Sequence, residues 1–209
     1  MMPRAVMVGV DKDLVDVIIT ERIAELVGIF NPRDEGDTLG VPWIGTDEEW
    51  PRWSAVHPDV AVIVTVDVPS MRRRLASGYG LERGMSVIAA SASMSPRAQA
   101  GSGCIIQRGV MVSADAVIGD AVKVNMGAQI HHDCRIGSFS TIAPGACLLG
   151  AVTVGEEVFV GANATVLPHR RVGSHAVVGA GAVVTKDVPE GATVTGVPAR
   201  EHRHDGAKR

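Results

Sequence analysis

The sequence predicts a parallel β-helix of six-residue repeats in the C-terminal half of the chain, preceded by a small α/β domain. The first observation is an aliphatic residue at every sixth position without a break, and all but one of these are β-branched: Ile106, Val112, Ile118, Val124, Ile130, Ile136, Ile142, Leu148, Val154, Val160, Val166, Val172, Val178 and Val184. The second is a small or short apolar residue four positions after most of them, with Arg170 as the clear exception: Ala116, Ala128, Cys134, Ala146, Ala164, Ala176 and Ala182. The third is a glycine directly after several of them, at positions 119, 137, 155, 161, 173 and 179.

A period of six fits neither an α-helix nor an alternating strand, so it indicates a repeat architecture. In a parallel β-helix each repeat supplies one short strand and one turn, and three repeats make a triangular coil. Residues 18 positions apart should then stack in one column, for example Ile106, Val124, Ile142, Val160 and Val178. β-Branched side chains suit such a stack because they pack well on a pleated surface.

Composition agrees with this architecture and narrows the function. The 209 residues are 46% hydrophobic but only 3% aromatic, a balance typical of stacked coils. A net charge of -3 gives no electrostatic reason to expect nucleic acid or an anionic membrane as partner. No apolar run is long enough to cross a membrane, and no long apolar segment opens the chain, so neither membrane insertion nor secretion is expected.

The three cysteines, Cys104, Cys134 and Cys147, cannot form a full set of disulfides. Cys104 and Cys134 occupy the small inward position of the repeat, which predicts packing residues of a reduced, cytoplasmic protein.

The pattern of residues 1–82 predicts a small α/β, Rossmann-like domain of the βαβ type. Short apolar runs predict strands at Val6–Val10, Leu26–Phe30 and Val60–Val66. Helices are expected at Lys12–Ile19, from the capping box Thr46–Glu49 through Trp53, and, as a basic surface helix, at Ser70–Ala76. A ligand crevice should lie at the carboxyl ends of the strands, near Gly9–Asp13, Asn31–Arg33 and Asp67.

The β-helix is expected to span residues 83–200, with a mobile, solvated tail at 201–209. Ile88, Met94 and Ala100 continue the period in degraded form, which predicts an irregular first coil. The period stops after Val184, and 196–200 should form a last extended segment.

The run His131-His132-Asp133 interrupts an otherwise bland face of the repeat. A histidine can take a proton from an amine or hydroxyl nucleophile, and an adjacent carboxylate can fix its tautomer. The alternative is a polar turn with exposed histidines, and geometry must decide between the two.

A metal site is the second alternative, in which His131, His132, His169 and His175 meet across the subunits of a trimer. Zinc needs ligands that converge on one ion. His169 and His175 are six apart and thus on different faces, and no third histidine stacks beneath His132, so no metal is expected. The other histidines, His57, His202 and His204, are expected to be solvated.

The turn Gly9–Asp13 resembles a phosphate-binding turn but keeps a single glycine. A plain strand-to-helix turn with an aspartate N-cap explains it equally well.

Several runs carry a resemblance to a family. They are Val124–Ala128, His132–Gly137, Ile142–Ala146, Val177–Pro189 and Gly196–Ala199. On these runs the chain resembles the bacterial sugar acetyltransferases that join a small nucleotide-binding domain to a left-handed β-helix. These include nucleotide-amino-sugar N-acetyltransferases and sialic-acid O-acetyltransferases. The His132-Asp133-Cys134 run is the more specific signal, because many hexapeptide acyltransferases share the terminal runs.

The resemblance implies a homotrimer that binds acetyl-CoA in the groove between two β-helices. It makes His132 the general base, oriented by Asp133, and places Asn125 beside the reacting centre. The backbone N–H near Gly150 would stabilise the developing oxyanion. Main-chain groups of outward turns would hold acetyl-CoA, with the following residues involved: Thr141, Ala162 and Ala180, and Val197 and Pro198 near the adenine.

The chain departs from the family pattern at three places. His131 replaces a residue that is commonly acidic. The glycine-rich first turn is reduced to Gly9, with Asp11 and Asp13 placed where they would repel a pyrophosphate. Asn31-Pro32-Arg33 replaces acidic residues, and Arg33 could contact a phosphate instead. The expected nucleotide-sugar residues are Gly9, Asp11, Lys12, Asn31 and Arg33.

The expected function is direct acetyl transfer from acetyl-CoA to the amino group of a UDP- or GDP-linked amino-deoxy sugar. The alternatives are a sialic-acid type O-acetyltransferase, a trimeric zinc enzyme and a non-catalytic binding scaffold on the same fold.

Overall fold

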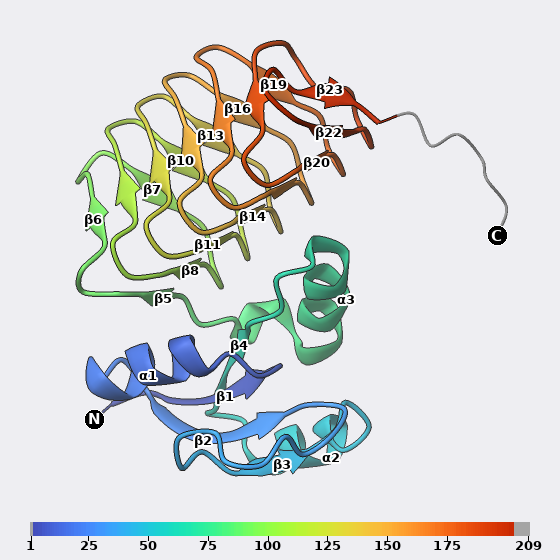
Figure 1. Ribbon diagram of the computed structural model, residues 1–209. Coiled ribbons are helices and arrows are strands. Elements are labelled where there is room, and N and C mark those ends of the chain that lie inside the picture. Colours follow the sequence, from blue (N-terminus) through green and yellow to red (C-terminus); the bar gives the residue numbers. More distant parts are fainter. Residues whose placement is uncertain (1, 203–209) are drawn as a thin grey trace, which may run out of the picture.

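The computed structural model describes residues 2–202, which form an α/β unit followed by a β-helix (Figure 1). The α/β unit runs from the first strand to a short 3-10 helix, in the order β1 (Arg4–Val8), α1 (Lys12–Thr20), β2 (Glu25–Phe30), β3 (Trp43–Gly45), α2 (Trp50–Val56), β4 (Ala61–Val64), α3 (Pro69–Tyr79) and η1 (Leu81–Arg83). Its four strands form one parallel sheet in the order β3-β2-β1-β4. The carboxyl ends of β1, β2 and β4 therefore lie together at one edge of the sheet.

The expected elements of the α/β unit are present, and two details differ. The reciprocal hydrogen bond of the capping box forms, because the Glu49 carboxylate accepts from the Thr46 N–H at 2.6 Å. The helix nevertheless begins only at Trp50, since residues 47–49 close a separate turn. The strand β3 was not anticipated from the sequence; it pairs with β2 and covers it with Ile44.

The helix α3 is not the simple surface helix that the sequence predicts. Arg72 is 1% exposed, and Ala76 and Tyr79 are also buried. The reason is its place in the fold: α3 lies between the sheet and the β-helix (Figure 1), where Ala76 packs with Ala121 and Phe139.

The β-helix contains seventeen two-residue strands followed by two terminal ones: β5 (Val87–Ile88), β6 (Ser93–Met94), β7 (Gln99–Ala100), β8 (Ile105–Ile106), β9 (Met111–Val112), β10 (Val117–Ile118), β11 (Lys123–Val124), β12 (Gln129–Ile130), β13 (Arg135–Ile136), β14 (Thr141–Ile142), β15 (Cys147–Leu148), β16 (Thr153–Val154), β17 (Phe159–Val160), β18 (Thr165–Val166), β19 (Arg171–Val172), β20 (Val177–Val178), β21 (Val183–Val184), β22 (Thr193–Thr195) and β23 (Arg200–Glu201). Every third strand joins the same sheet, which makes three sheets along the stack. Neighbouring coils thus satisfy each other's backbone groups.

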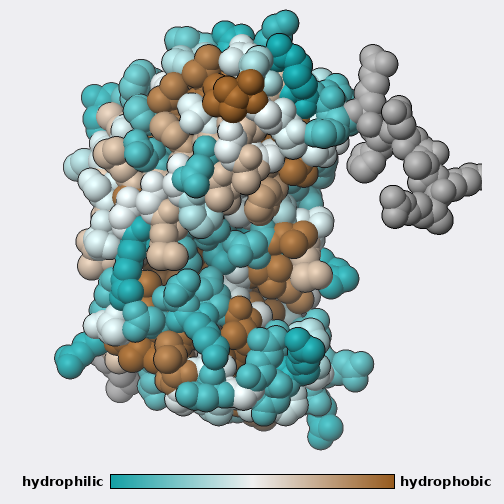
Figure 2. All heavy atoms as spheres, viewed as in Figure 1, coloured by the Kyte–Doolittle hydropathy of each residue, from teal (hydrophilic) through white to brown (hydrophobic). Residues whose placement is uncertain are grey.

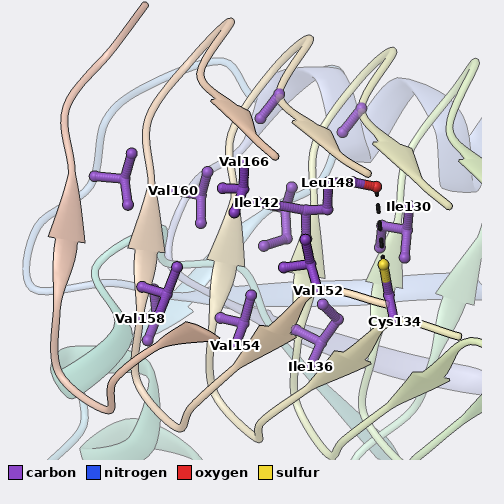
Figure 3. Close-up of a cluster of buried hydrophobic side chains, with 14 of the residues drawn as sticks. Ile130, Cys134, Ile136, Ile142, Leu148, Val152, Val154, Val158, Val160 and Val166 are labelled. Atoms are coloured by element: carbon purple, nitrogen blue, oxygen red, sulfur yellow. Dashed lines mark hydrogen bonds between the residues drawn. The ribbon is translucent and has the colours of Figure 1, made fainter. Parts of the chain in front are cut away.

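The predicted 18-residue columns are confirmed. Ile106 pairs with Val124, Val124 with Ile142, and Ile142 with Val160. All fourteen aliphatic residues of the period are 3% exposed or less. Figure 3 shows part of this core, with Ile130, Ile136 and Leu148 among the inward side chains.

The inward cysteines are packing residues, as predicted. Cys104 and Cys134 are fully buried, and the Cys134 thiol lies 3.8 Å from the Leu148 carbonyl oxygen (Figure 3). Burial raises the pKa of both thiols, so both stay protonated near neutrality.

Both ends of the β-helix extend further than the period suggests. The first coil is not irregular: β5, β6 and β7 pair with the next coil in the same 18-residue register. At the other end the period stops after Val184, as expected, but the core continues through Val188 and Val194. There β22 pairs with β20 at a spacing of 16, and β23 returns antiparallel to β22. The predicted tail lies largely outside the described residues.

The surface is mixed. On the face shown in Figure 2, hydrophobic residues form separate patches among hydrophilic ones. Within residues 2–202, no helix has the length and apolar character needed to cross a membrane.

Candidate active site

A cleft of about 500 Å³ opens where the α/β unit meets the β-helix. One wall comes from the carboxyl ends of the parallel strands and includes Gly9, Asp11, Asn31, Thr65 and Asp67. The other wall comes from the β-helix and includes Gln107, Lys123, Asn125, Met126 and Pro144. The predicted crevice is therefore in the expected place, and the β-helix supplies a second wall that the sequence did not indicate.

Gly9 and Asn31 shape the first wall. Gly9 has a φ of +88°, and a Cβ there would lie 3.0 Å from the Thr65 hydroxyl, so the turn needs glycine for both conformation and space. Asn31 is 9% exposed, and its side-chain amide donates to the Arg33 carbonyl at 2.9 Å. Asn31 therefore stabilises its own loop while it faces the cleft.

Lys12 and Arg33, expected as substrate residues, do not line the cleft. Lys12 is exposed on the first turn of α1. The Arg33 side chain is 82% exposed, and its nearest carboxylate is that of Glu35 at 3.8 Å. The geometry does not support the prediction for these two residues, since both side chains extend into solvent.

Asp11 has two roles in this structure. It is the N-cap of α1, where its carboxylate accepts from the Leu14 N–H at 3.0 Å, so the plain strand-to-helix turn is confirmed. Its other oxygen lies 2.9 Å from the Lys123 ammonium. The expected repulsion between Asp11 and a phosphate is therefore offset by a neighbouring cation.

Lys123 is the main site residue that sequence reasoning missed. Its side chain is 2% exposed, and its ammonium also contacts Asp67 Oδ1 at 3.0 Å and the Thr65 carbonyl at 2.7 Å. The only available signal was a lysine at an outward position of the repeat, and such a residue is usually solvated. The docking of the α/β unit over this face is what buries it.

Asp67 joins the two walls. Its Oδ1 accepts from the Asn125 side-chain amide at 3.0 Å, and its carbonyl oxygen accepts from the Thr141 hydroxyl at 2.6 Å. Thr141 was expected in an outward turn that holds acetyl-CoA. It lies instead in β14 and is fully buried beneath Asp67. The expectation that Thr141 lies in an outward turn is therefore wrong.

Arg72 ties α3 to the β-helix. Its guanidinium donates to the carbonyls of Val66, Asp67, Ala121, Phe139 and Ser140 at 2.6–3.3 Å. Burial lowers the pKa of Arg72 to about 10, so it remains charged at neutral pH. A single buried cation thus holds together the loop after β4 and two corners of the β-helix.

His132 and Asp133 occupy a corner of the β-helix. The His132 Nδ1 lies 2.8 Å from Asp133 Oδ2, and the two side chains are 63% and 59% exposed. The carboxylate favours the tautomer with the proton on Nδ1, which leaves Nε2 free as a base. The neighbouring His131 is directed elsewhere, since its Nε2 lies 3.8 Å from the Cys147 thiol.

Gly150 lies against the His132 ring. A Cβ at Gly150 would be 2.7 Å from both Cε1 and Nε2 of the imidazole. The Ala151 N–H and the Gly150 carbonyl are used in the stacking of corners, but the Gly150 N–H donates no hydrogen bond to residues 2–202. The residue that lies against the imidazole therefore carries an unpaired N–H.

The other expected acetyl-CoA residues lie along a second corner of the β-helix. Main-chain bonds stack Met126, Pro144, Ala162 and Ala180 in one column, for example Gly181 N to the Ala162 carbonyl at 2.8 Å. The N–H groups of Ala162 and Ala180 have no acceptor within the described residues. Val197 and Pro198 are exposed beyond β22.

A single chain does not bring these groups into one site. Asn125 lines the cleft at the Met126 corner, whereas His132 belongs to the next corner and does not line the cleft. No group of three or more potential metal-binding His, Cys, Asp or Glu side chains occurs within residues 2–202.

Comparisons with known proteins agree with this fold. The model of the bacterial transferase hexapeptide family (six repeats) matches residues 115–150 and 151–186. A comparison with curated protein sequences finds no match.

Solved structures give the wider similarity. The chain is 30% identical to PerB from Caulobacter crescentus in complex with CoA and GDP-perosamine, over 95% of this chain and 97% of that one, with a TM-score of 0.88. It is 31% identical to the acetyltransferase domain of PglB from Neisseria gonorrhoeae, over 96% and 100% of the chains, with a TM-score of 0.84. The same domain in complex with acetyl coenzyme A matches with a TM-score of 0.89 at 29% identity, over 97% and 100% of the chains.

A β-helix of six-residue repeats that matches the bacterial transferase hexapeptide family defines a hexapeptide-repeat transferase. More particularly, the chain belongs to the sugar acetyltransferases of the left-handed β-helix superfamily, and it uses acetyl-CoA as co-substrate.

Proposed function

We propose that this enzyme transfers the acetyl group of acetyl-CoA to the amino group of a nucleotide-linked, UDP- or GDP-linked, amino-deoxy sugar. Similarity over nearly the whole chain to an enzyme solved with CoA and GDP-perosamine supports this substrate class. The observation that carries the acetyl transfer is the free Nε2 of His132 beside the free N–H of Gly150.

The reaction is direct transfer within a ternary complex. The neutral amine attacks the thioester carbonyl carbon, a C–N bond forms, and His132 Nε2 takes a proton from the nitrogen. Asp133 stabilises the imidazolium, and the Gly150 N–H donates to the oxyanion. When the tetrahedral intermediate collapses, the C–S bond breaks and the imidazolium returns the proton to the CoA sulfur. The products are the N-acetylated sugar and CoA.

The active enzyme is a homotrimer with active sites between subunits. Asn125 and His132 lie at different corners of one chain, and a second copy offers a way to bring one of each together. Residues 1–82 hold the nucleotide sugar and adopt a Rossmann-like fold, and residues 83–200 hold the acyl donor.

Acetyl-CoA runs along the Ala162 and Ala180 corner towards Val197 and Pro198. Small side chains there leave room for the pantetheine arm to approach the unpaired N–H groups. The setting is cytoplasmic, in keeping with three free thiols.

The decisive experiment is a screen that reads CoA release with UDP- and GDP-linked amino sugars, and with sialic acid as the hydroxyl acceptor. Turnover with an amino sugar is expected, and turnover with sialic acid alone would make the enzyme an O-acetyltransferase. Acetyl-CoA should raise the melting temperature, since a ligand at about 100 times its Kd stabilises the native state by roughly 2.7 kcal/mol. Metal analysis of the active protein tests the zinc alternative.

Mixed trimers test the placement of the site. Inactive His132→Asn and Asn125→Ala chains, refolded or expressed together, should recover activity, because some interfaces then receive an intact His132 and an intact Asn125. Mixtures as inactive as either parent would contradict a site shared between subunits.

A further inference from the structure

A second hollow, here called the slot, opens beside the cleft at the carboxyl edge of the parallel sheet. Its volume is about 190 Å³. Its apolar walls come from the ends of three strands and from α3, and they consist of Val8, Phe30, Pro32, Val66, Met71 and Leu75. The slot has room for one ring system and not for a whole nucleotide sugar, since small-molecule sites usually measure roughly 300–1,000 Å³.

The slot is continuous with the cleft. Gly9, Asn31 and Val66 line both hollows. A ligand that is larger than either hollow can therefore extend from one into the other across the turn after β1. A sugar joined to a base through a diphosphate is a ligand of this form.

Two charged side chains stand at the slot, Asp47 from the turn before α2 and Arg74 from α3. Both are exposed, and they do not pair with each other. Within residues 2–202 the Arg74 side chain makes no hydrogen bond or ion pair, and the Asp47 side chain makes one hydrogen bond. An apolar hollow with a few polar groups is the usual form of a small-molecule site.

Tyr79 holds the Asp47 carboxylate in place. Its hydroxyl donates to Asp47 Oδ1 at 2.7 Å, and its buried ring packs against Trp50 and Phe30. Burial and the hydrogen bond to Asp47 raise the pKa of Tyr79, so the hydroxyl keeps its proton. Asp47 Oδ2 has no partner in the described part of the chain, and Oδ1 retains a second lone pair. Both oxygens of one positioned carboxylate are thus available as acceptors.

The common bases differ in what they offer to a carboxylate. Guanine has two adjacent donors, N1–H and the 2-amino group, next to the O6 acceptor. Uracil has a single N3–H between two carbonyl oxygens, and one of these would be repelled by the second carboxylate oxygen. Adenine and cytosine place a ring-nitrogen acceptor beside their amino group. Only the guanine edge therefore matches both oxygens of an ionised carboxylate, which accepts and cannot donate.

We propose that the slot binds the base of the nucleotide sugar and that Asp47 is the specificity-determining residue that selects guanine over uracil. The 2-amino group donates to Asp47 Oδ2, N1–H donates to Oδ1, and Arg74 donates to O6. The sugar then lies in the cleft. This inference rests on the proposed function and narrows its substrate from a UDP- or GDP-linked sugar to a GDP-linked one.

The test measures binding of GDP, IDP and UDP to the full chain by calorimetry, without acetyl-CoA, so that no turnover occurs. IDP has the purine ring of GDP and lacks only the 2-amino group, so it separates recognition of the edge from the size of the base. The wild type should bind GDP about tenfold or more tightly than UDP, and several-fold more tightly than IDP, because a paired set of contacts to a base edge has about this effect.

Asp47→Asn keeps the acceptor for Tyr79 and turns the other oxygen into a donor. It should weaken GDP binding by about tenfold or more and change UDP binding by less than about threefold. It should also tighten binding of XDP, because xanthine carries a carbonyl oxygen where guanine carries the 2-amino group. Glu48→Gln is the matched control: it removes a charge from the next residue, which does not line the slot, and should leave all four affinities unchanged.

Three results would overturn the inference. One is a wild type that binds GDP, IDP and UDP equally, or binds none of them. Another is an Asp47→Asn variant that weakens GDP and UDP to the same extent, or neither, since Asp47 would then contact the shared ribose or nothing. The third is an unchanged affinity of this variant for XDP.

Failure of the proposed function gives a different result. CoA release with a UDP-linked amino sugar and not with a GDP-linked one would keep the proposed function and overturn this inference. A preference for GDP that depends on Asp47, without CoA release from any amino sugar, would keep the inference about the slot and overturn the proposed reaction.

Discussion

The imidazole of His132 lies against the α-carbon of Gly150, so closely that a Cβ at position 150 would be 2.7 Å from two ring atoms. Gly150 has no positive φ, so the position needs glycine for space and not for backbone conformation. The same contact places an unpaired N–H beside the nitrogen expected to act as base. Position 150 therefore has no room for a side chain while the His132 ring keeps this place.

Replacement of Gly150 by alanine should separate activity from stability. The added methyl displaces the His132 ring, and kcat should fall by roughly tenfold to a hundredfold because a base must be held in place. The melting temperature should change little, since the ring is exposed and can swing into solvent. Gly78→Ala in α3 is the control: nothing lies within 4 Å of its Cβ, and a gain of about 0.5–1 kcal/mol in stability is expected. A fully active Gly150→Ala enzyme would contradict this geometry.

Removal of the proposed base, His132, should affect turnover more than binding. His132→Asn or His132→Ala should lower kcat by about a hundredfold or more, the usual effect of losing a positioned base. The KM for acetyl-CoA should be nearly unchanged. His175→Asn, at another corner and 3.9 Å from Glu157, controls for the loss of an exposed histidine. Near-normal turnover of the His132 variants at neutral pH would show that another group takes the proton.

The stability of the contact between the α/β unit and the β-helix should depend on Lys123. In Lys123→Met, Asp11 and Asp67 lose the cation that they share, and the free energy of unfolding should fall by about 3–5 kcal/mol, as when one partner of a buried ion pair is removed. Urea unfolding measures the change. Adding Asp11→Asn to Lys123→Met should restore part of the loss, because one of the orphaned charges is gone. Equal stability of the wild type and Lys123→Met would mean that the ion pairs of Lys123 with Asp11 and Asp67 add nothing to the free energy of unfolding.

A lysine should not replace Arg72. Arg72→Lys keeps the charge but loses the planar set of donors that reaches five carbonyls, so a loss of about 3 kcal/mol or more is expected. Thermal or chemical unfolding gives the value. Arg74→Lys, an exposed arginine of the same helix, should change stability by less than about 0.5 kcal/mol. Similar losses of stability in Arg72→Lys and Arg74→Lys would contradict the role of Arg72 in joining α3 to the β-helix.

Thiol reactivity should follow burial. Burial raises the pKa of Cys104 and Cys134 above the ordinary value of 9.0, so alkylation of the native protein should modify at most one thiol, that of Cys147. The unfolded chain should react at all three. The same shifts predict that stability falls as pH rises above about 9, because the unfolded thiols then lose protons that the folded ones retain. Mass spectrometry counts the alkylated thiols. Alkylation of Cys104 or Cys134 in the native protein would contradict this prediction.

Repetition made the β-helix predictable. Each aliphatic residue of the period meets the same environment 18 residues later, so the pattern specified the columns from Ile106 to Val178, and the inward Cys104 and Cys134 with them. The His132–Asp133 contact was also within reach, because the two residues are adjacent and share one corner. The crevice near Gly9 and Asn31 followed from a general rule for parallel strands.

Tertiary structure decided what covers the repeat. An outward residue looks the same in the sequence whether it faces water or a second unit, so nothing marked Lys123 and Thr141 as buried or Arg72 as the residue that joins the two parts. Lys12 and Arg33 lie outside the cleft for the same reason, since the direction of a side chain beyond a loop depends on packing between distant segments. Local periodicity determined the scaffold, and the docking of the α/β unit over the first coils determined the cleft.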